Sequence, residues 1–170
     1  MHLPIIGIVV LIALGIALAA LKAAGATAAG KAKADVYYLK ASMFSPAERS
    51  FLGVLEALNL DGVTIASKVR LADIFGIKRG LTRGDRLRAL NRIAAKHVDF
   101  LLIQATDGRP LLGIELDDGS HDDEQRFARD SFVDTVYQCA RLPILHVAAK
   151  RAYDPKEIRR RLDEALAHGC

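Results

Sequence analysis

Cysteine is scarce in this chain, and several common catalytic signatures are missing. Cys139 and Cys170 are its two cysteines, so there is no disulfide framework and nothing requires an oxidising compartment. The sequence has no Cys-x-x-Cys pair, no glycine-rich phosphate loop and no serine nucleophile elbow. These absences argue against dithiol redox chemistry, P-loop nucleotide binding and serine-hydrolase catalysis.

Charge of either sign is missing from Leu3–Leu21, although 26% of all residues are charged. A helix of that length spans about 28 Å, close to the ~30 Å hydrocarbon core of a bilayer. We expect a retained transmembrane helix, with a cleaved signal peptide as the alternative. Because Lys22, Lys31 and Lys33 follow the run, the positive-inside rule predicts a single-pass protein of the bacterial inner membrane with a cytoplasmic soluble domain.

The remaining sequence has the length and composition of one domain. The chain has 170 residues and a mildly basic net charge of +4. An alanine-, glycine- and lysine-rich stretch without an apolar period separates the charge-free run from the rest. We therefore predict a transmembrane anchor over 1–23, a linker over 24–38 and one soluble domain over 39–170.

The domain alternates between helical and strand patterns. Ser45–Glu48 has the residues of a capping box, and Asp154–Glu157 starts a last helix in the same way. Asp107–Pro110 is a turn that predicts a hairpin between the strands on either side. Two further helices are expected over Thr82–Ile93 and Asp122–Cys139, and strands over Val63–Leu71, Val98–Ile103, Leu111–Leu116 and Pro143–Val147. This order predicts an α/β fold with a mixed sheet flanked by helices.

Three acidic residues stand at the ends of the two hairpin strands. Asp99 begins one strand, while Glu115 and Asp117 end the next and point to the same face. Converging carboxylates repel one another unless a cation neutralises them, and oxygen ligands suit Mg²⁺. Such a metal would activate water against a phosphodiester. The alternative is a polar turn at Asp117, with Glu115 paired to an arginine.

The residues that follow offer secondary roles. His121 could orient a water or a phosphate. Arg126 and Asp130 share a helix face, where an ion pair is the simplest interpretation. If that face borders the acids, Asp130 would orient His121 and Arg126 would contact a phosphate. The other histidines of the domain have no ligand-like spacing and are interpreted as structural: His97, His146 and His168.

Basic residues crowd the segment 78–96, where only Asp85 opposes them. Lysine and arginine contacts to phosphates supply most non-specific affinity for nucleic acid. We predict such contacts for Arg83, Arg86 and Arg92. Two alternatives stay open, namely contact with an anionic lipid surface and a solvated charged face without a partner.

The run from Leu39 to Leu166 resembles domain-of-unknown-function family 2726, a bacterial family of the restriction-endonuclease-like (PD-(D/E)XK) superfamily. It is similar to the very-short-patch-repair-type endonuclease branch. The matching pieces are SPAERSFLGVL, KVRLADIF, HVDFLLI, IELDDGSHDDEQRFARDSFVDTVY and LPILHV. The resemblance implies a core of helix, three strands, helix and strand, with Asp99 and Glu115 as metal-binding acids.

Asp117 departs from that pattern, because it stands where the superfamily usually has lysine. His121, or Lys68 or Lys96 brought in by the fold, could replace the lysine. The predicted catalytic residues are therefore Asp99, Glu115, Asp117 and His121, with Mg²⁺ as cofactor and nucleic acid as substrate. The alternatives are a nuclease fold that binds nucleic acid without cutting it, and a membrane-proximal interaction domain.

Overall fold

The computed structural model describes residues 12–22, 36–117 and 124–167. The chain divides into two compact units, Met1–Met43 and Phe44–Cys170. The first unit carries the charge-free run, and the second carries the sheet and every candidate site residue.

The first unit corrects the membrane prediction. Residues 12–22 form a helix, which spans roughly 16 Å at about 1.5 Å per residue, and residues 3–11 of the charge-free run lie outside the described part. In the portion of the chain that the structure describes, no helix is both long and apolar enough to cross a membrane. The transmembrane helix predicted over Leu3–Leu21, and the single-pass inner-membrane location drawn from it, are therefore wrong.

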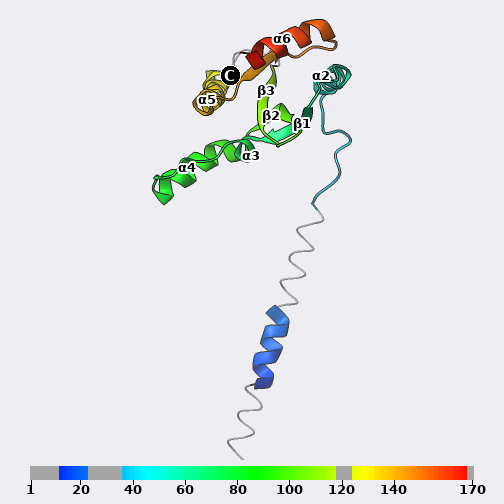
Figure 1. Cartoon of the computed structure of the whole chain (residues 1–170). Coiled ribbons are helices and arrows are strands. Elements are labelled where there is room, and N and C mark those ends of the chain that lie inside the picture. The colour runs from blue at the N-terminus through cyan, green and yellow to red at the C-terminus, as the bar shows by residue number, and fades with distance from the viewer. Residues whose placement is uncertain (1–11, 23–35, 118–123, 168–170) are drawn as a thin grey trace, which may run out of the picture. The chain divides into compact units, whose positions relative to one another are not determined.

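The second unit contains the alternating helices and strands that the sequence patterns predict (Figure 1). The elements, in chain order, are α2 (Pro46–Ala57), β1 (Val63–Arg70), α3 (Leu71–Ile74), α4 (Arg83–Ala94), β2 (His97–Gln104), β3 (Pro110–Asp117), α5 (Glu124–Ala140), β4 (Ile144–Ala148) and α6 (Pro155–Ala167). The fold is therefore mixed α/β, and the expected strands agree with the observed ones to within one or two residues.

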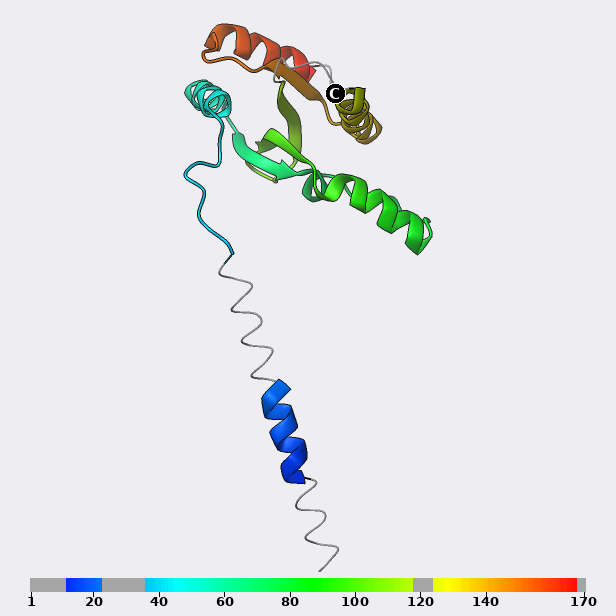
Figure 2. The ribbon, with the colours of Figure 1, turned by 180° about the vertical axis from the view of Figure 1, so that it is seen from behind.

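The four strands form one sheet in the order β1-β2-β3-β4 (Figure 2). β1 pairs with β2, and β2 with β3, in antiparallel orientation, so the predicted hairpin is present. β3 and β4 are parallel, and α5 supplies the crossover between them. The sheet is mixed, as the element order predicted.

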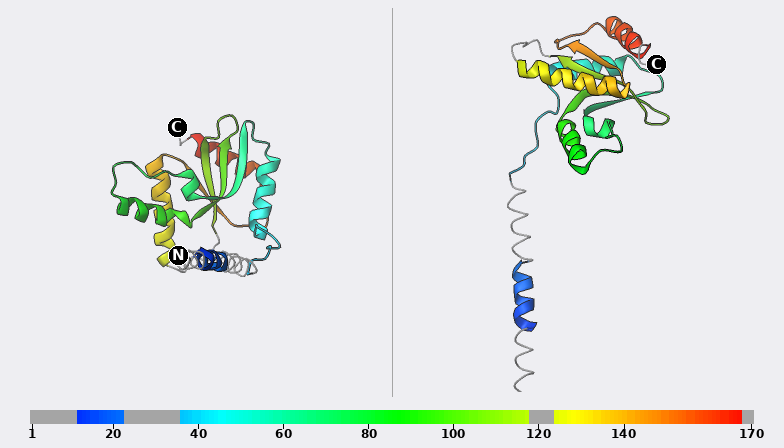
Figure 3. Two further views of the ribbon diagram at one scale, coloured as in Figure 1. Left: turned by 90° about the horizontal axis from the view of Figure 1, so that it is seen from below. Right: turned by 90° about the vertical axis from the view of Figure 1, so that its left-hand side faces the viewer.

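Apolar side chains cover both faces of the sheet. On one face, α2 and α6 contribute Phe51, Leu55, Ile158 and Leu162, which pack with Phe100, Leu102, Leu112 and Ile114 of the sheet. On the other face, α3, α4 and α5 contribute Leu71, Ile93 and Tyr137, which pack with Val98 and Leu101. In the left view of Figure 3, α6 passes behind the strands. The unit thus has three layers, with the sheet between two helical layers.

Helix α4 extends away from the sheet (Figures 1 and 2). Thr82 caps it, because its hydroxyl accepts a hydrogen bond from the Asp85 backbone N–H. Ile93, near its C-terminal end, is its buried residue. The rest of the helix presents its side chains largely to solvent.

Candidate functional site

Four strands each place one ionisable residue on a line that crosses the sheet. Ser67 pairs with Phe100 and Val69 with Val98, which sets Lys68 opposite Asp99. Phe100 pairs with Ile114, so the next position in register sets Asp99 opposite Glu115. Glu115 pairs with His146. We call Lys68, Asp99, Glu115 and His146 the polar row.

Lys68 begins the polar row at a break in strand β1. Its φ of 54° lies in the left-handed region, which is strained for a residue with a side chain. Ala66 and Val69 pack on the same face despite their spacing of three, because the break interrupts the alternation of a regular strand. The side chain at the break reaches carboxylates of a neighbouring strand and of a helix.

The Lys68 ammonium joins two carboxylates. Its Nζ donates to Asp99 Oδ1 at 2.9 Å and also to Glu48 Oε1. The Lys68 side chain is 30% exposed, and those of Glu48 and Asp99 are 15% and 16% exposed. Burial alone would lower the pKa of Lys68, but the hydrogen bonds to Glu48 and Asp99 outweigh it and raise the pKa. Lys68 is therefore positively charged at neutral pH.

Glu48 and Asp99 are each held by a second contact. Glu48 is the third residue of α2, and its Oε2 accepts from the Ser45 backbone N–H at 2.7 Å in the predicted capping box. Asp99 Oδ2 accepts from the Leu116 backbone N–H at 2.9 Å. One carboxylate thus ties α2 to β1, and the other ties β2 to both of its neighbours.

The surroundings of the Glu115 carboxyl group disfavour its ionised form. Burial raises its pKa to about 8, and the negative charge of Asp99 and a hydrogen bond with Asp99 add to the rise. Asp117 contributes in the same direction, while His146 opposes it. Glu115 therefore keeps its proton at neutral pH, and perturbed acids of this kind are concentrated at functional sites.

His146 lies between two aspartates. Its Nδ1 is 3.2 Å from Asp117 Oδ1, and its Nε2 is 3.0 Å from Asp134 Oδ1 on α5. Burial alone would lower the pKa of His146, but the hydrogen bonds to Asp117 and Asp134 outweigh it and raise the pKa. A protonated His146 offsets the charge of both aspartates and fixes the direction of Asp117.

Tyr137 of α5 covers the face of β3 that carries Gly113 and Glu115. Its side chain is fully buried and packs edge-on against Phe75, with ring centroids 4.9 Å apart. A Cβ atom on Gly113 would lie 2.6 Å from the Tyr137 hydroxyl, so glycine is needed beneath the ring. Burial and then the charge of nearby Glu115 raise the pKa of Tyr137. Its hydroxyl has no hydrogen-bond partner among the described residues.

The predicted acids come together only in part. Asp99 and Glu115 are in contact, whereas Asp117 is turned to His146. Over 12–22, 36–117 and 124–167, no group of three or more His, Cys, Asp or Glu side chains is arranged to hold a metal ion. The Mg²⁺ site of Asp99, Glu115 and Asp117 therefore stays a prediction.

The other predicted residues have different outcomes. His121 lies outside the described residues, as do the side chains of Arg126 and Asp130, so their proposed roles stay predictions. His146 was interpreted as structural from its spacing, yet it belongs to the polar row. Glu48 was recognised as a helix cap but not as a partner of Lys68, and no local signal in the sequence marks Asp134.

The three arginines predicted to contact nucleic acid are not equivalent. Arg83 and Arg86 are exposed on the outer side of α4. Arg92 instead places its guanidinium 3.8 Å from the centroid of the Phe132 ring, a cation–π contact that joins α4 to α5. Arg83 and Arg86 are thus available to an anionic partner. Arg92 is also exposed, and the phosphate contacts expected of all three arginines stay predictions.

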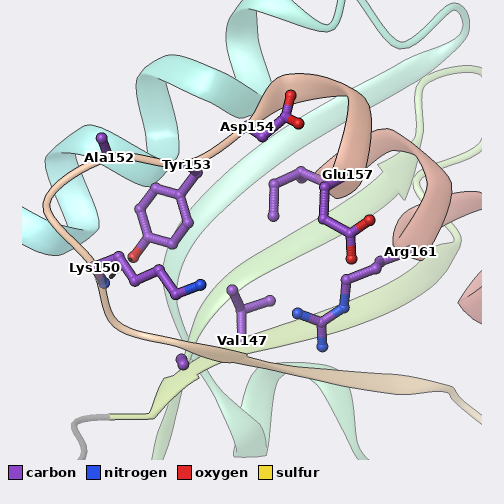
Figure 4. A pocket seen from close by; sticks show the side chains of 9 residues that line it. Val147, Lys150, Ala152, Tyr153, Asp154, Glu157 and Arg161 are labelled. Carbon is purple, nitrogen blue, oxygen red and sulfur yellow. Dashed lines mark hydrogen bonds between the residues drawn. The ribbon is translucent and has the colours of Figure 1, made fainter.

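A separate hollow lies on the α6 side of β4 (Figure 4). Its lining includes Val147, Lys150, Tyr153, Glu157 and Arg161. Its volume of about 160 Å³ is smaller than the ~300–1,000 Å³ of ordinary ligand pockets. It opens on the face opposite Tyr137, so it does not extend the polar row.

Comparison with known proteins gives a family but no characterised relative. The sequence model of the family described as "Protein of unknown function (DUF2726)" matches residues 40–166, which is most of the chain. No curated protein and no solved structure matches significantly.

Proposed function

Since the chain belongs to the DUF2726 family, we propose its function from its own residues: a divalent-metal-dependent hydrolase of nucleic-acid phosphodiesters. The observation that carries the proposal is the position of Lys68 against Asp99, next to Glu115 in one row. Restriction-endonuclease-like enzymes combine two acids with a lysine, and Asp117 occupies the usual lysine position here. Lys68, from a different strand, would supply the missing cation.

The donor set suits a hard divalent cation. Asp99, Glu115 and Asp117 offer carboxylate oxygens, which Mg²⁺ prefers. The raised pKa of Glu115 arises from burial and from two neighbouring acids, and a bound cation would relieve this unfavourable concentration of carboxylates. These three residues would hold Mg²⁺, which would supply an activated water and charge stabilisation at the phosphodiester.

The surrounding residues have separate roles in this proposal. Lys68 keeps its proton, so it would act as a fixed positive charge beside the substrate phosphate rather than as a base. His146 orients Asp117 through its Nδ1 atom. Glu48 holds the Lys68 ammonium in place from α2. We also propose that this chain belongs to the PD-(D/E)XK superfamily and is similar to its very-short-patch-repair-type branch. The motifs HVDFLLI and IELDDGSHDDEQRFARDSFVDTVY support this assignment.

One observation favours a second function, namely binding of nucleic acid without cleavage. Asp99 is already neutralised by Lys68, and Asp117 is already engaged with His146. A site in which the acids satisfy internal partners can lose its metal and keep its fold. Fold alone does not establish activity, so the two functions need a direct test.

The test is a cleavage and binding assay of the full chain on duplex DNA, single-stranded DNA and RNA, with Mg²⁺, Mn²⁺ or a chelator. We expect cleavage only with a divalent cation, and its loss in Glu115→Gln. Asp163→Asn is the matched control, because Asp163 is an exposed α6 acid paired with Arg159. Binding without cleavage would favour the second function, and the absence of both would overturn the two together.

Replacing Arg83 and Arg86 by alanine is expected to weaken nucleic-acid binding about equally for all sequences. Each lost phosphate contact on duplex DNA should flatten the slope of log affinity against log salt by about 0.9. Filter binding at several salt concentrations measures both effects.

The matched control removes two arginines elsewhere. Arg159 and Arg160 of α6 form ion pairs with neighbouring acids, so Arg159→Ala with Arg160→Ala changes the net charge equally but should leave the slope nearly unchanged. Equal effects from the two double variants would mean that only net charge matters and that α4 is not the contact surface.

A further inference from the structure

Two cationic side chains face the hollow beside β4 without an acidic partner. Figure 4 shows that Lys150 and Arg161 reach over Val147 from opposite sides and point into the hollow. Arg161 donates from Nη2 to the neutral backbone carbonyl oxygen of His146 at 2.6 Å. Within the described parts of the chain, no carboxylate forms an ion pair with Arg161 or with the Lys150 ammonium. Both charges are therefore available to a molecule that enters the hollow.

The two acids that line the hollow are engaged elsewhere. Glu157 accepts two hydrogen bonds from Arg160, at 2.8 and 3.1 Å. Asp154 turns its carboxylate away from the hollow (Figure 4) and accepts from the Lys156 backbone N–H at 3.0 Å. Since these acids already have partners, the hollow has an excess of positive charge. Two like charges that share one space repel each other until an anion lies between them.

The size and lining of the hollow suit a phosphate group. Its volume of about 160 Å³ is too small for a drug-sized ligand, whose pockets measure ~300–1,000 Å³. Arginine offers a planar fork of donors and lysine a compact point charge, and both bind phosphate oxygens. Tyr153 also lines the hollow. Its hydroxyl accepts from the Lys150 backbone N–H at 2.9 Å and can still donate its own proton.

We propose that this hollow binds a phosphate monoester or inorganic phosphate, held by Lys150 and Arg161. Such a group carries about −1.5 to −2 charges at neutral pH, which complements two cations better than the single charge of a phosphodiester. The hollow lies on the α6 side of β4, so the inference needs neither a metal ion nor the proposed hydrolysis. The phosphate group can belong to a small molecule or to the end of a nucleic-acid strand.

The experiment measures binding of inorganic phosphate to the full chain by calorimetry and by thermal melts at constant ionic strength, with chloride as the reference anion. We expect phosphate, and not chloride, to raise the melting temperature of the wild type. We expect Lys150→Met to weaken phosphate affinity at least about tenfold, because a charge-assisted hydrogen bond is lost. Lys150 is exposed, so without phosphate this variant should melt no lower than the wild type.

Lys156→Met is the matched control. Lys156 is exposed in the first turn of α6 and does not line the hollow, so this variant removes the same charge from outside the site. Its phosphate affinity should stay within about twofold of the wild type, because salt screens exposed charges. Equal losses in the two variants would show that net charge alone attracts phosphate, and would overturn the site. A wild type that responds equally to phosphate and chloride would also overturn it.

A tyrosine difference spectrum locates the bound phosphate. The chain has four tyrosines and no tryptophan, and Tyr153 lines the hollow. We expect phosphate to produce a near-ultraviolet difference band in the wild type and in Lys156→Met, and no band in Tyr153→Phe. A band that persists in Tyr153→Phe would place the phosphate elsewhere and contradict the proposal.

Two further ligands distinguish the source of the phosphate group. A short oligonucleotide with a terminal phosphate, and the same strand without it, compete with inorganic phosphate for the wild type and for Lys150→Met. Stronger competition by the phosphorylated strand, lost in Lys150→Met, would identify a strand end as the ligand. Equally weak competition by both strands, while inorganic phosphate binds, would identify a small phosphate-bearing molecule. Either result supports the phosphate site.

Discussion

Replacement of Lys68 by methionine is expected to destabilise the protein by about 2–4 kcal/mol in a chelating buffer. The substitution leaves Glu48 and Asp99, both largely buried, without their shared cation. Methionine keeps most of the apolar stem and meets the same backbone strain at φ 54°, so the effect isolates the ammonium. Chemical denaturation of wild type and variant measures the difference in unfolding free energy.

The pH dependence of this difference has a definite sign. The pKa of Lys68 is raised above its ordinary value of 10.5. A raised lysine pKa contributes stability that is fully present below pH 10.5 and is lost as the pH rises through the folded-state pKa. The gap between wild type and Lys68→Met should therefore be constant from pH 7 to 10 and narrow at higher pH.

Lys156→Met is the control for Lys68, because it removes the same charge from an exposed position on α6. It should change stability by less than about 0.5 kcal/mol. Added Mg²⁺ should return part of the lost stability to Lys68→Met, since unneutralised carboxylates attract the cation. If Lys68→Met were as stable as the wild type, solvent would screen the ion pairs of Lys68 with Glu48 and Asp99. Lys68 would then be removed from the proposed site.

Local patterns predicted the elements of this fold well. The capping box at Ser45 and Glu48 forms as expected, and so does the hairpin around Asp107–Pro110. These features depend on residues within a few positions of one another, where propensity and turn chemistry act directly. The transmembrane prediction for the charge-free run was also based on local composition, and it was wrong. An apolar composition fits a bilayer, but it does not determine the length of the helix.

The site depends on contacts that local patterns do not contain. Glu115 and Asp117 share a face by strand period alone, and this was predictable. The partner of Asp117 is His146, which reaches it only through the parallel pairing of β4 with β3. Lys68 meets Asp99 through antiparallel register and a local break in β1. Register and crossover are long-range properties, so His146 and the Lys68 contact with Glu48 could not be derived from spacing.

Replacing Glu115 by glutamine is expected to have an effect on the stability of the cation-free protein that depends on pH. The unfolding free energy of the variant, relative to that of the wild type, should be higher at pH 8 and above than at pH 4. The folded-state pKa of Glu115 is about 8, against an ordinary 4.5. Between these values the unfolded chain releases the proton while the folded protein keeps it, so wild-type stability falls as pH rises and levels off above pH 8. At ~1.4 kcal/mol per unit the upper limit is about 5 kcal/mol, and we expect about 2–3 kcal/mol.

The decisive measurement is the stability of wild type minus that of Glu115→Gln from pH 4 to 9, with and without Mg²⁺. Glu157→Gln is the control, because its pKa is lowered by a hydrogen bond to Arg160, so that residue contributes stability above pH 4.5 that is lost on acidification. Without a cation, the Glu115 difference should decline through the range 4.5–8 and then stay flat. With Mg²⁺, the wild type should regain the stability that it loses at high pH, because the cation replaces the proton on Glu115. The variant should show no such gain. A wild type that ignores Mg²⁺, together with a variant that loses several kcal/mol at every pH, would identify Glu115 as half of a structural pair and remove it from the proposed catalytic centre.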